Sequence, residues 1–205
     1  MDESSAIIYP NIVAFMVGLI IIWLLLRESL QTEKEQHPLT VGRIVIWSII
    51  GFLLAWGSQI LAITIEMQIL DIQPGSDNTD FIVNLSQENI WFLALPALIG
   101  PIIEELVFRK TIFGALKNRM NIHVAAIIGA LIFAVVHFDL EHTLIYFAMG
   151  LVFTFLYVKT KRIIVPIIAH MTMNGLAVIG QMLIDPEELE RMREQLTFIL
   201  LGGWF

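Results

Sequence analysis

Six polar side chains lie inside otherwise apolar stretches of this 205-residue sequence. They are Glu104, Glu105, Arg109, His137, His170 and Asn174. A carboxylate and an imidazole can activate a water molecule and transfer its proton, and imidazole and amide groups can donate to a developing oxyanion. Charged groups are costly inside a bilayer and are commonly functional there. We therefore take these six residues as the candidate site.

Helical spacing predicts how the acidic pair is arranged. Glu105 and Arg109 are four residues apart, so they share a helix face and can pair. Glu104 is turned by about 100° from its neighbour, which leaves it free to face a cavity. His170 and Asn174 are also four residues apart and point the same way. The stripe Ala126, Ala130 and Ala134 before His137 would let another helix approach closely.

The composition excludes most soluble classes of protein. Hydrophobic residues make up 57% of the chain and charged residues only 15%, which indicates an integral membrane protein and not a soluble enzyme or a disordered chain. The net charge of −7 disfavours nucleic acid as a partner. The chain contains no cysteine, so disulfides, thiolate metal sites and a cysteine nucleophile are all excluded.

Six apolar stretches position the candidate residues. They are Ile7–Leu26, Ile44–Ile65, a stretch from about Ile90 that carries the acidic pair, Ile122–His137, Thr143–Val158 and Ile163–Ile184. We predict an all-α, polytopic membrane bundle of about six transmembrane helices, with the catalytic centre buried between three of them. Within the third stretch we expect a helix over Leu98–Leu116, because the depths of Glu104 and His137 match only if it continues past Arg109. Ile90–Pro96 would be a separate segment, broken off near Pro96 or Pro101.

The chain is expected to form one membrane domain over residues 1–205. Residues 7–70 would hold two N-terminal spans, residues 90–184 the catalytic core, and residues 185–205 a surface helix and an apolar tail. Whether that tail belongs to a longer spanning helix is left open. Asp71–Asp80, which contains Pro74-Gly75, is the one clear flexible loop.

The loop charges predict the orientation of the helices. Lys and Arg occur in residues 27–43, 109–121 and 159–162, whereas residues 71–89 and 138–142 contain neither. The positive-inside rule then places the basic loops in the cytoplasm and the N-terminus outside. The face to which the site opens and the oligomeric state are left open.

Together the three motifs resemble the signature of the CAAX-protease and bacteriocin-processing family, also called the Abi family, which includes the Rce1-type CAAX prenyl proteases. The motifs are Glu104-Glu105-x-x-x-Arg109, Phe133-x-x-x-His137 and His170-x-x-x-Asn174, and the resemblance covers roughly Pro96–Leu183.

The resemblance implies an intramembrane endopeptidase. Glu104 and His137 would activate a water, His170 and Asn174 would polarise the scissile carbonyl, and Glu105 and Arg109 would support the site. The substrate would be a membrane-associated protein or peptide. Because the chain looks like that of a multi-pass protein of a bacterial cell membrane, a peptide pheromone, a bacteriocin leader or a membrane-protein tail is expected before a prenylated CAAX protein.

Metal dependence stays open at this stage. Glu104, His137 and His170 could bind zinc, but the sequence lacks the His-Glu-x-x-His motif of soluble zinc peptidases, and Asn174 suits an oxyanion better than zinc. We favour a glutamate mechanism without a cofactor, with zinc as the alternative.

Two other functions compete with the peptidase. One is a non-catalytic membrane scaffold or bacteriocin-immunity protein of the same family, and the other is a small membrane transporter, which would predict internal repeats that the sequence lacks. The other histidines are interpreted as solvated surface: His37, His123 and His142. Gln59 and Glu66 are interpreted as helix contacts or outer-face residues.

Overall fold

The computed structural model describes residues 3–185, 187–188 and 191–195, and no strand occurs among them. Its elements in chain order are α1 (Glu3–Gln36), α2 (Val41–Ile69), α3 (Asp77–Glu88), η1 (Ile90–Leu93), η2 (Leu95–Ile99), α4 (Gly100–Glu104), η3 (Glu105–Phe113), α5 (Gly114–Leu116), α6 (Ile122–Val135), α7 (Thr143–Thr160) and α8 (Ile164–Leu183). η1 is a 3₁₀ turn, and η2 and η3 are π-helical.

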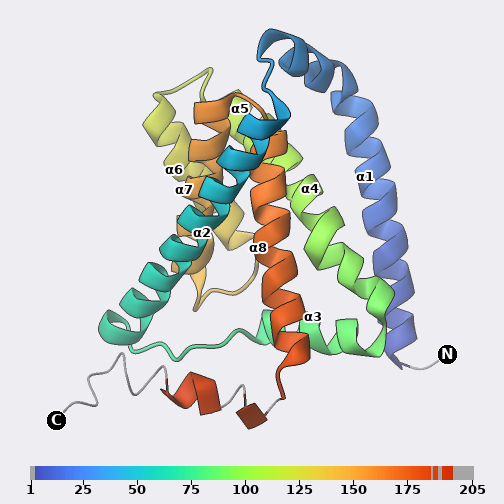
Figure 1. The fold of residues 1–205 in the computed structure, drawn as a ribbon, viewed down its shortest axis with the longest axis vertical. Helices are drawn as coiled ribbons and strands as arrows, with labels where there is room; N and C mark the ends of the chain where they lie inside the picture. Colours follow the sequence, from blue (N-terminus) through green and yellow to red (C-terminus); the bar gives the residue numbers. More distant parts are fainter. Residues whose placement is uncertain (1–2, 186, 189–190, 196–205) are drawn as a thin grey trace.

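The predicted helical membrane bundle is confirmed (Figure 1). Among the described residues, five helices are long and apolar enough to span a bilayer: Ser5–Gln36, Val41–Ile69, Ile90–Leu116, Thr143–Thr160 and Ile164–Leu183. The remaining apolar helix, α6, has 14 residues. Because α6 ends at Val135, His137 lies in the turn after it and not in its last turn.

The helix that carries the acidic pair is continuous, so the predicted break before Leu98 is wrong. The chain is helical from Ile90 to Leu116 and changes its hydrogen-bond register along the way. Pro96 and Pro101 lack a backbone N–H, and they lie in the first positions of η2 and α4, where the hydrogen-bond register changes. The prolines therefore mark changes of register and not a break.

Part of the expected flexible loop is helix α3, which begins at Asp77. Ser76 caps its N-terminus, because its hydroxyl accepts a hydrogen bond from the Thr79 N–H at 3.3 Å. α3 lies across one end of the bundle (Figure 1). The sequence pattern that predicts this helix is a capping serine followed by apolar residues at helical spacing.

A surface helix was expected after Ile184. The described residues 187–188 and 191–195 are helical, and the Asp185 carboxylate accepts from the Glu187 N–H at 2.9 Å. The apolar stretch Leu196–Phe205 lies outside the described residues.

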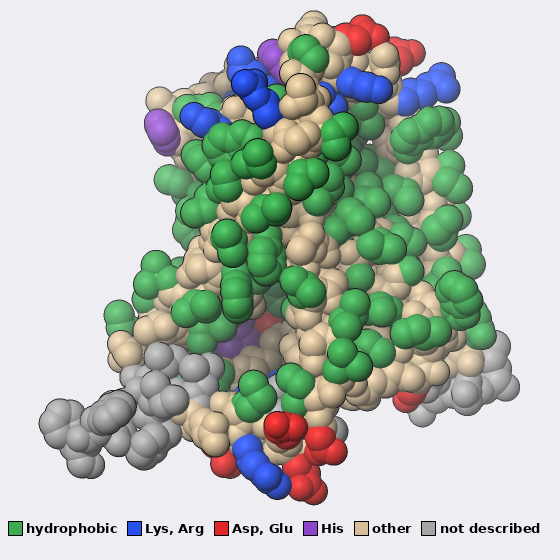
Figure 2. Space-filling view, in the orientation of Figure 1, with side chains coloured by type: hydrophobic (Ala, Val, Ile, Leu, Met, Phe, Trp, Pro, Cys, Tyr) green, Lys and Arg blue, Asp and Glu red, His purple; other side chains and the backbone are tan. Residues whose placement is uncertain are grey.

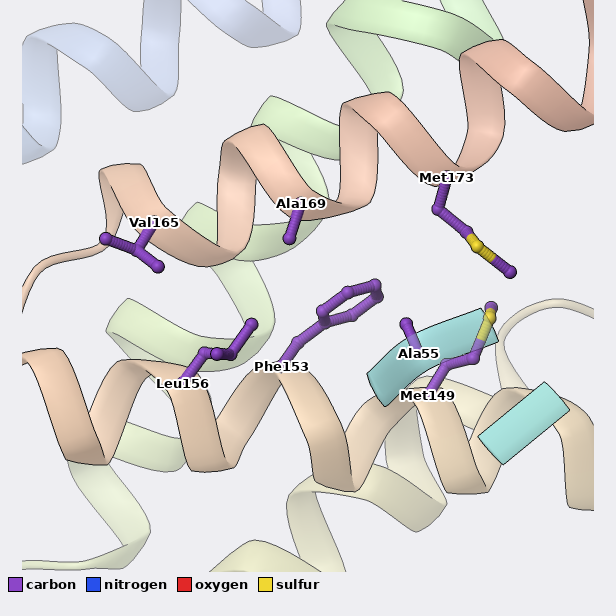
Figure 3. Packing of buried hydrophobic residues seen from close by; sticks show 7 residues of the cluster. All are labelled: Ala55, Met149, Phe153, Leu156, Val165, Ala169 and Met173. Atoms are coloured by element: carbon purple, nitrogen blue, oxygen red, sulfur yellow. The ribbon is translucent and has the colours of Figure 1, made fainter. Parts of the chain in front are cut away.

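The main core lies between α2, α7 and α8 (Figure 3). Its fully packed members are Ala55, Met149, Phe153, Leu156, Val165, Ala169 and Met173. Gly51 brings α2 close to this core, because a Cβ at that position would lie 2.4 Å from Leu156 Cδ1. α6 and α7 also approach closely, because a Cβ at Gly150 would lie 3.1 Å from Ala130. That contact includes one member of the predicted alanine stripe.

The two ends of the bundle differ in charge. On the face shown in Figure 2, hydrophobic side chains cover the middle of the bundle, and Lys and Arg gather at one end and are scarce at the other. The end at which Lys and Arg gather carries residues 27–43, 109–121 and 159–162, and we call it the basic end. The opposite end carries residues 71–89 and 138–142, which contain no Lys or Arg, and we call it the base-poor end.

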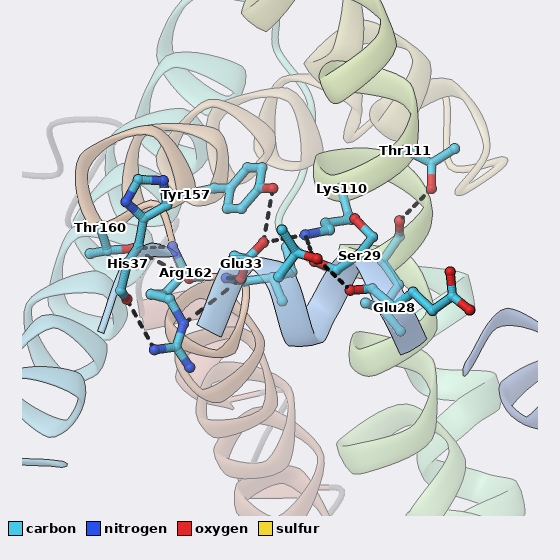
Figure 4. Close-up of polar contacts among 12 residues, drawn as sticks. Glu28, Ser29, Glu33, His37, Lys110, Thr111, Tyr157, Thr160 and Arg162 are labelled. Carbon is cyan, nitrogen blue, oxygen red and sulfur yellow. Dashed lines mark hydrogen bonds and ion pairs between the residues drawn. The ribbon is translucent and has the colours of Figure 1, made fainter. Parts of the chain in front are cut away.

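A buried carboxylate holds α1 to the bundle at the basic end (Figure 4). Glu33 accepts hydrogen bonds from the Ile163 N–H at 2.7 Å and the Tyr157 hydroxyl at 3.1 Å, and it pairs with Lys110. Arg162 Nε lies 3.9 Å from the same carboxylate. One side chain of α1 thus joins η3, α7 and the start of α8.

Replacing Glu33 by alanine should destabilise the protein by about 3–5 kcal/mol, because it leaves buried cationic partners without their countercharge. Thermal unfolding in detergent measures the effect. The matched control is Glu28→Ala on the exposed side of the same helix, which should change stability by less than about 0.5 kcal/mol. Equal effects of the two substitutions would contradict the anchoring role.

Candidate active site

The structure brings Glu104, His137 and His170 together from three separate elements. Glu104 Oε2 lies 3.9 Å from His137 Nε2 and 3.7 Å from His170 Nε2. Glu104 is the last residue of α4, His137 follows α6, and His170 lies on α8. One carboxylate oxygen therefore faces both imidazoles at distances slightly too long for direct hydrogen bonds.

Glu105 points away from Glu104 and into the core. Its side chain is fully buried, and Oε1 lies 2.9 Å from His170 Nδ1 and 3.2 Å from Arg109 Nη1. Because the carboxylate oxygen accepts, Nδ1 is the donor and His170 Nε2 is directed at Glu104. The pair predicted from spacing is thus present, and it also orients an imidazole.

Aromatic rings enclose Arg109 and His170. The guanidinium carbon lies 4.0 Å from the centroid of Phe133 on α6 and 5.4 Å from that of Phe153 on α7. Phe153 also stacks on His170, with centroids 4.5 Å apart. Cation–π contacts of this kind strengthen when they are desolvated, and here they surround a buried charge.

His137 is oriented from two directions. Its Nδ1 lies 2.7 Å from the Phe133 carbonyl, which can only accept, so Nδ1 is the donor and Nε2 is available on the Glu104 side. Tyr146 of α7 stacks on the ring, with centroids 4.1 Å apart and planes at 25°. The Tyr146 hydroxyl in turn contacts Asp139 at 3.4 Å, and Asp139 accepts from Ser76 at 2.6 Å.

The change of helical register frees a carbonyl for Asn174. In η2 the Gly100 N–H bonds to Leu95 and not to Pro96. Pro101 has no N–H, so it cannot satisfy the Pro96 carbonyl five residues earlier. Asn174 Nδ2 donates to that carbonyl at 3.2 Å. π-helical turns are frequent at functional sites, and this one fixes the position of the amide on α8.

These residues face a cavity of about 540 Å³. Its wall includes Glu104, His137, His170 and Asn174, whereas Glu105 and Arg109 lie behind it. The structure thus places four of the six candidate residues on the cavity wall and two in support.

The same cavity wall contains a pair that the sequence analysis missed. Glu66 Oε2 of α2 lies 2.9 Å from His142 Nδ1, and both side chains are buried. The interpretation of His142 as solvated surface is therefore wrong. The two residues are 76 positions apart and belong to no shared motif, so only the helix packing reveals the pair.

The donor types of the site would suit zinc, since a carboxylate and two imidazoles form a common ligand set. Among the described residues, however, no group of three or more His, Asp or Glu side chains is arranged so that it could hold a metal ion. The mechanism proposed below therefore has no step through a metal.

A half-buried carboxylate, two oriented imidazoles and an amide lie around one cavity inside a bundle of apolar helices. Together they define a multi-pass membrane protein with a hydrolase-like site. Comparison with known proteins identifies the class. The family model for type II CAAX prenyl endopeptidases, Rce1-like, matches residues 86–176.

Three relatives are similar to this chain. A protein of Bacillus subtilis named putative membrane peptidase YdiL is 39% identical over 196 residues, which cover 95% of this chain and 80% of that protein. The membrane-embedded CAAX protease MroQ of Staphylococcus aureus is 36% identical over 209 residues, covering 97% and 83%. The UPF0177 protein YxdF of Lactococcus lactis is 35% identical over 78 residues, covering 38% and 42%. No solved structure matches.

The chain therefore belongs to the Rce1-like CAAX protease family, and it is a multi-pass membrane protease of that family. This confirms the resemblance drawn from the three motifs.

The stacking of Tyr146 on His137 predicts a difference between two substitutions. Tyr146→Phe keeps the ring and should retain most of the peptidase activity. Tyr146→Leu removes the stacking surface and should lower kcat by up to about 100-fold, with a smaller change in KM, because His137 is no longer held in place. Peptide cleavage measures both constants, and thermal unfolding shows that the variants remain folded. Equal kcat values for the two variants would contradict the positioning role.

Proposed function

We propose that the protein is an intramembrane endopeptidase that hydrolyses a peptide bond of a membrane-associated protein or peptide without a metal. Residues 90–184 form its catalytic core. The observation that carries this proposal is that Glu104 Oε2 lies between two imidazole Nε2 atoms, 3.7 and 3.9 Å away, on the wall of a substrate-sized cavity.

In the first step a water binds in the cavity within hydrogen-bonding reach of Glu104 and His137. The separations of 3.9 Å from His137 Nε2 and 3.7 Å from His170 Nε2 are too long for direct hydrogen bonds, so Glu104 Oε2 can accept a hydrogen bond from a water in the cavity. Glu104 takes the proton of the water while its oxygen attacks the scissile carbonyl carbon. His137 assists, because its Nδ1 donates to the Phe133 carbonyl and its Nε2 can accept from the same water.

In the second step the tetrahedral oxyanion needs hydrogen-bond donors. His170 supplies one through Nε2, while its Nδ1 donates to the Glu105 carboxylate at 2.9 Å. Asn174 supplies the other, because only one of its two amide hydrogens is needed for the Pro96 carbonyl. The carbon–nitrogen bond then breaks, and Glu104 returns its proton to the leaving amine.

Glu105 and Arg109 position the site and do not touch the substrate. Arg109 neutralises the buried Glu105 at 3.2 Å, and Glu105 directs His170 at 2.9 Å. Removing Arg109 would leave the buried Glu105 carboxylate without its cationic partner, which is strongly destabilising.

We further propose that the protein resides in a bacterial cell membrane with its N-terminus outside. Bacterial relatives support the first part, and the absence of Lys and Arg from residues 71–89 and 138–142 supports the second. A peptide pheromone, a bacteriocin leader or a membrane-protein tail fits this setting as the substrate.

Cleavage of a fluorogenic library of membrane peptides by the purified protein tests the catalytic roles. Glu104→Gln and His170→Ala should each lower kcat by about 10²–10⁴-fold, the usual contribution of general base and oxyanion groups. Glu141→Gln and His123→Ala are matched controls with exposed side chains and should retain activity. Full activity of Glu104→Gln would refute the mechanism, and a wild type inactive on a broad library would favour the scaffold or immunity function.

The same assay separates the glutamate mechanism from a zinc mechanism. Under the glutamate mechanism, dialysis against a strong zinc chelator should leave cleavage within about twofold of the untreated protein, because no step uses a metal. Loss of activity that added zinc restores would instead make Glu104, His137 and His170 metal ligands. Metal analysis of the purified protein provides an independent measurement.

A further inference from the structure

The cavity extends from the candidate catalytic residues toward one end of the bundle only. On α8 its lining residues run from His170 to Gln181, and on α2 they run from Gln59 to Met67. The α2 set lies in the later half of its helix, which ends at Ile69, and the α8 set continues from the middle of its helix almost to its end at Leu183. Among the described residues, the loop Ile72–Ser76 and Asn78 and Thr79 of α3 complete this part of the wall.

The mouth lies where α2 and α8 diverge. Figure 2 shows a hollow in this face of the bundle, with histidine and acidic side chains visible inside it and hydrophobic side chains around it. In Figure 1 the same region lies between the lower halves of α2 and α8, above the loop that leads to α3. A substrate can therefore enter from the side of the bundle, near its base-poor end.

The loops beside this mouth lack the Lys and Arg residues that favour a cytoplasmic location for a loop. Residues 71–89 and 138–142 contain no Lys or Arg. Two arginines of the C-terminal segment also lie at this end, and both are paired with carboxylates: Arg193 with Asp80 at 2.8 Å and Arg191 with Glu187 at 3.4 Å. The positive-inside rule assigns such an end to the outside of the membrane.

We propose that the site opens on the extracytoplasmic side of the bilayer, between α2 and α8, and that it accepts the outer juxtamembrane segment of a membrane-attached peptide or protein. This inference rests on the proposed peptidase function. It excludes segments that stay in the cytoplasm as substrates.

The chemistry of the wall fits an extended peptide. Besides Asn174, five carboxamide side chains line it: Asn11, Gln59, Gln73, Asn78 and Gln181. A carboxamide can donate to a peptide carbonyl and accept from a peptide N–H without a net charge. Apolar residues such as Ile63, Phe81 and Met173 line the space between them. The wall would therefore hold the backbone of an extended, largely apolar segment.

Cysteine labelling tests the orientation, because the chain has no cysteine of its own. Gln73→Cys places a thiol at an exposed position of the mouth, and Asn118→Cys places one at an exposed position of the basic end. A membrane-impermeant maleimide–polyethylene glycol should modify Gln73→Cys in intact cells and should reach Asn118→Cys only after permeabilisation. Both variants should react fully in detergent, which shows that each thiol is reactive.

Modification of Asn118→Cys in intact cells, alone or together with Gln73→Cys, would overturn the orientation. The labelling requires no catalysis, so a repeat in the Glu104→Gln background should give the same pattern. The inference and the proposed mechanism can therefore fail separately.

Cleavage of the fluorogenic peptides by the labelled proteins tests the route of entry. The polymer on Gln73→Cys should lower the cleavage rate at least tenfold relative to the same variant without the polymer, because it obstructs the mouth. The polymer on Asn118→Cys should leave the rate unchanged. Undiminished cleavage by fully labelled Gln73→Cys would show that substrate enters elsewhere.

Discussion

The burial of Arg109 is the constraint on which the rest of the site depends. A guanidinium inside an apolar bundle needs a countercharge, and Glu105 provides it at 3.2 Å. The same carboxylate holds His170 of α8, while Phe133 of α6 and Phe153 of α7 cover the guanidinium. Four parts of the chain must therefore meet at one point. Satisfying this one charge leaves Glu104 and both imidazoles on the cavity wall.

The irregular register of the helix Ile90–Leu116 has a comparable role. A regular α-helix would satisfy the Pro96 carbonyl within its own backbone, and Asn174 would lose that partner. The combination of a π-helical turn and Pro101 leaves the carbonyl free, and Asn174 donates to it at 3.2 Å. The helix thus loses one internal hydrogen bond at Pro96, and the bond from Asn174 that replaces it holds α8 close to the helix that carries Glu104.

The contacts that hold the helices together and the cavity that would admit a substrate lie toward opposite ends of the bundle. At the basic end Glu33 joins α1 to η3, α7 and the start of α8, and Gly51 lets α2 pack tightly on α7. Toward the base-poor end α2 and α8 diverge and the cavity lies between them. One end of the bundle is therefore held by buried charge and close packing, while the other end leaves room for a substrate.

The sequence by itself determined the class of fold, the membrane setting, the family and the six candidate residues, because apolar length and helical spacing are local properties of the chain. It also predicted the Glu105–Arg109 pair, which lies within one helix. Only the tertiary structure decided that Glu105 also orients His170, that Pro96 is the partner of Asn174, and that Glu66 and His142 form a buried pair. These contacts join residues 65 to 78 positions apart, so they depend on how the helices pack and not on any local pattern. The unbroken helix through Pro96 and Pro101 also depends on packing, because Asn174 of α8 supplies a hydrogen bond that the changed register leaves unmade.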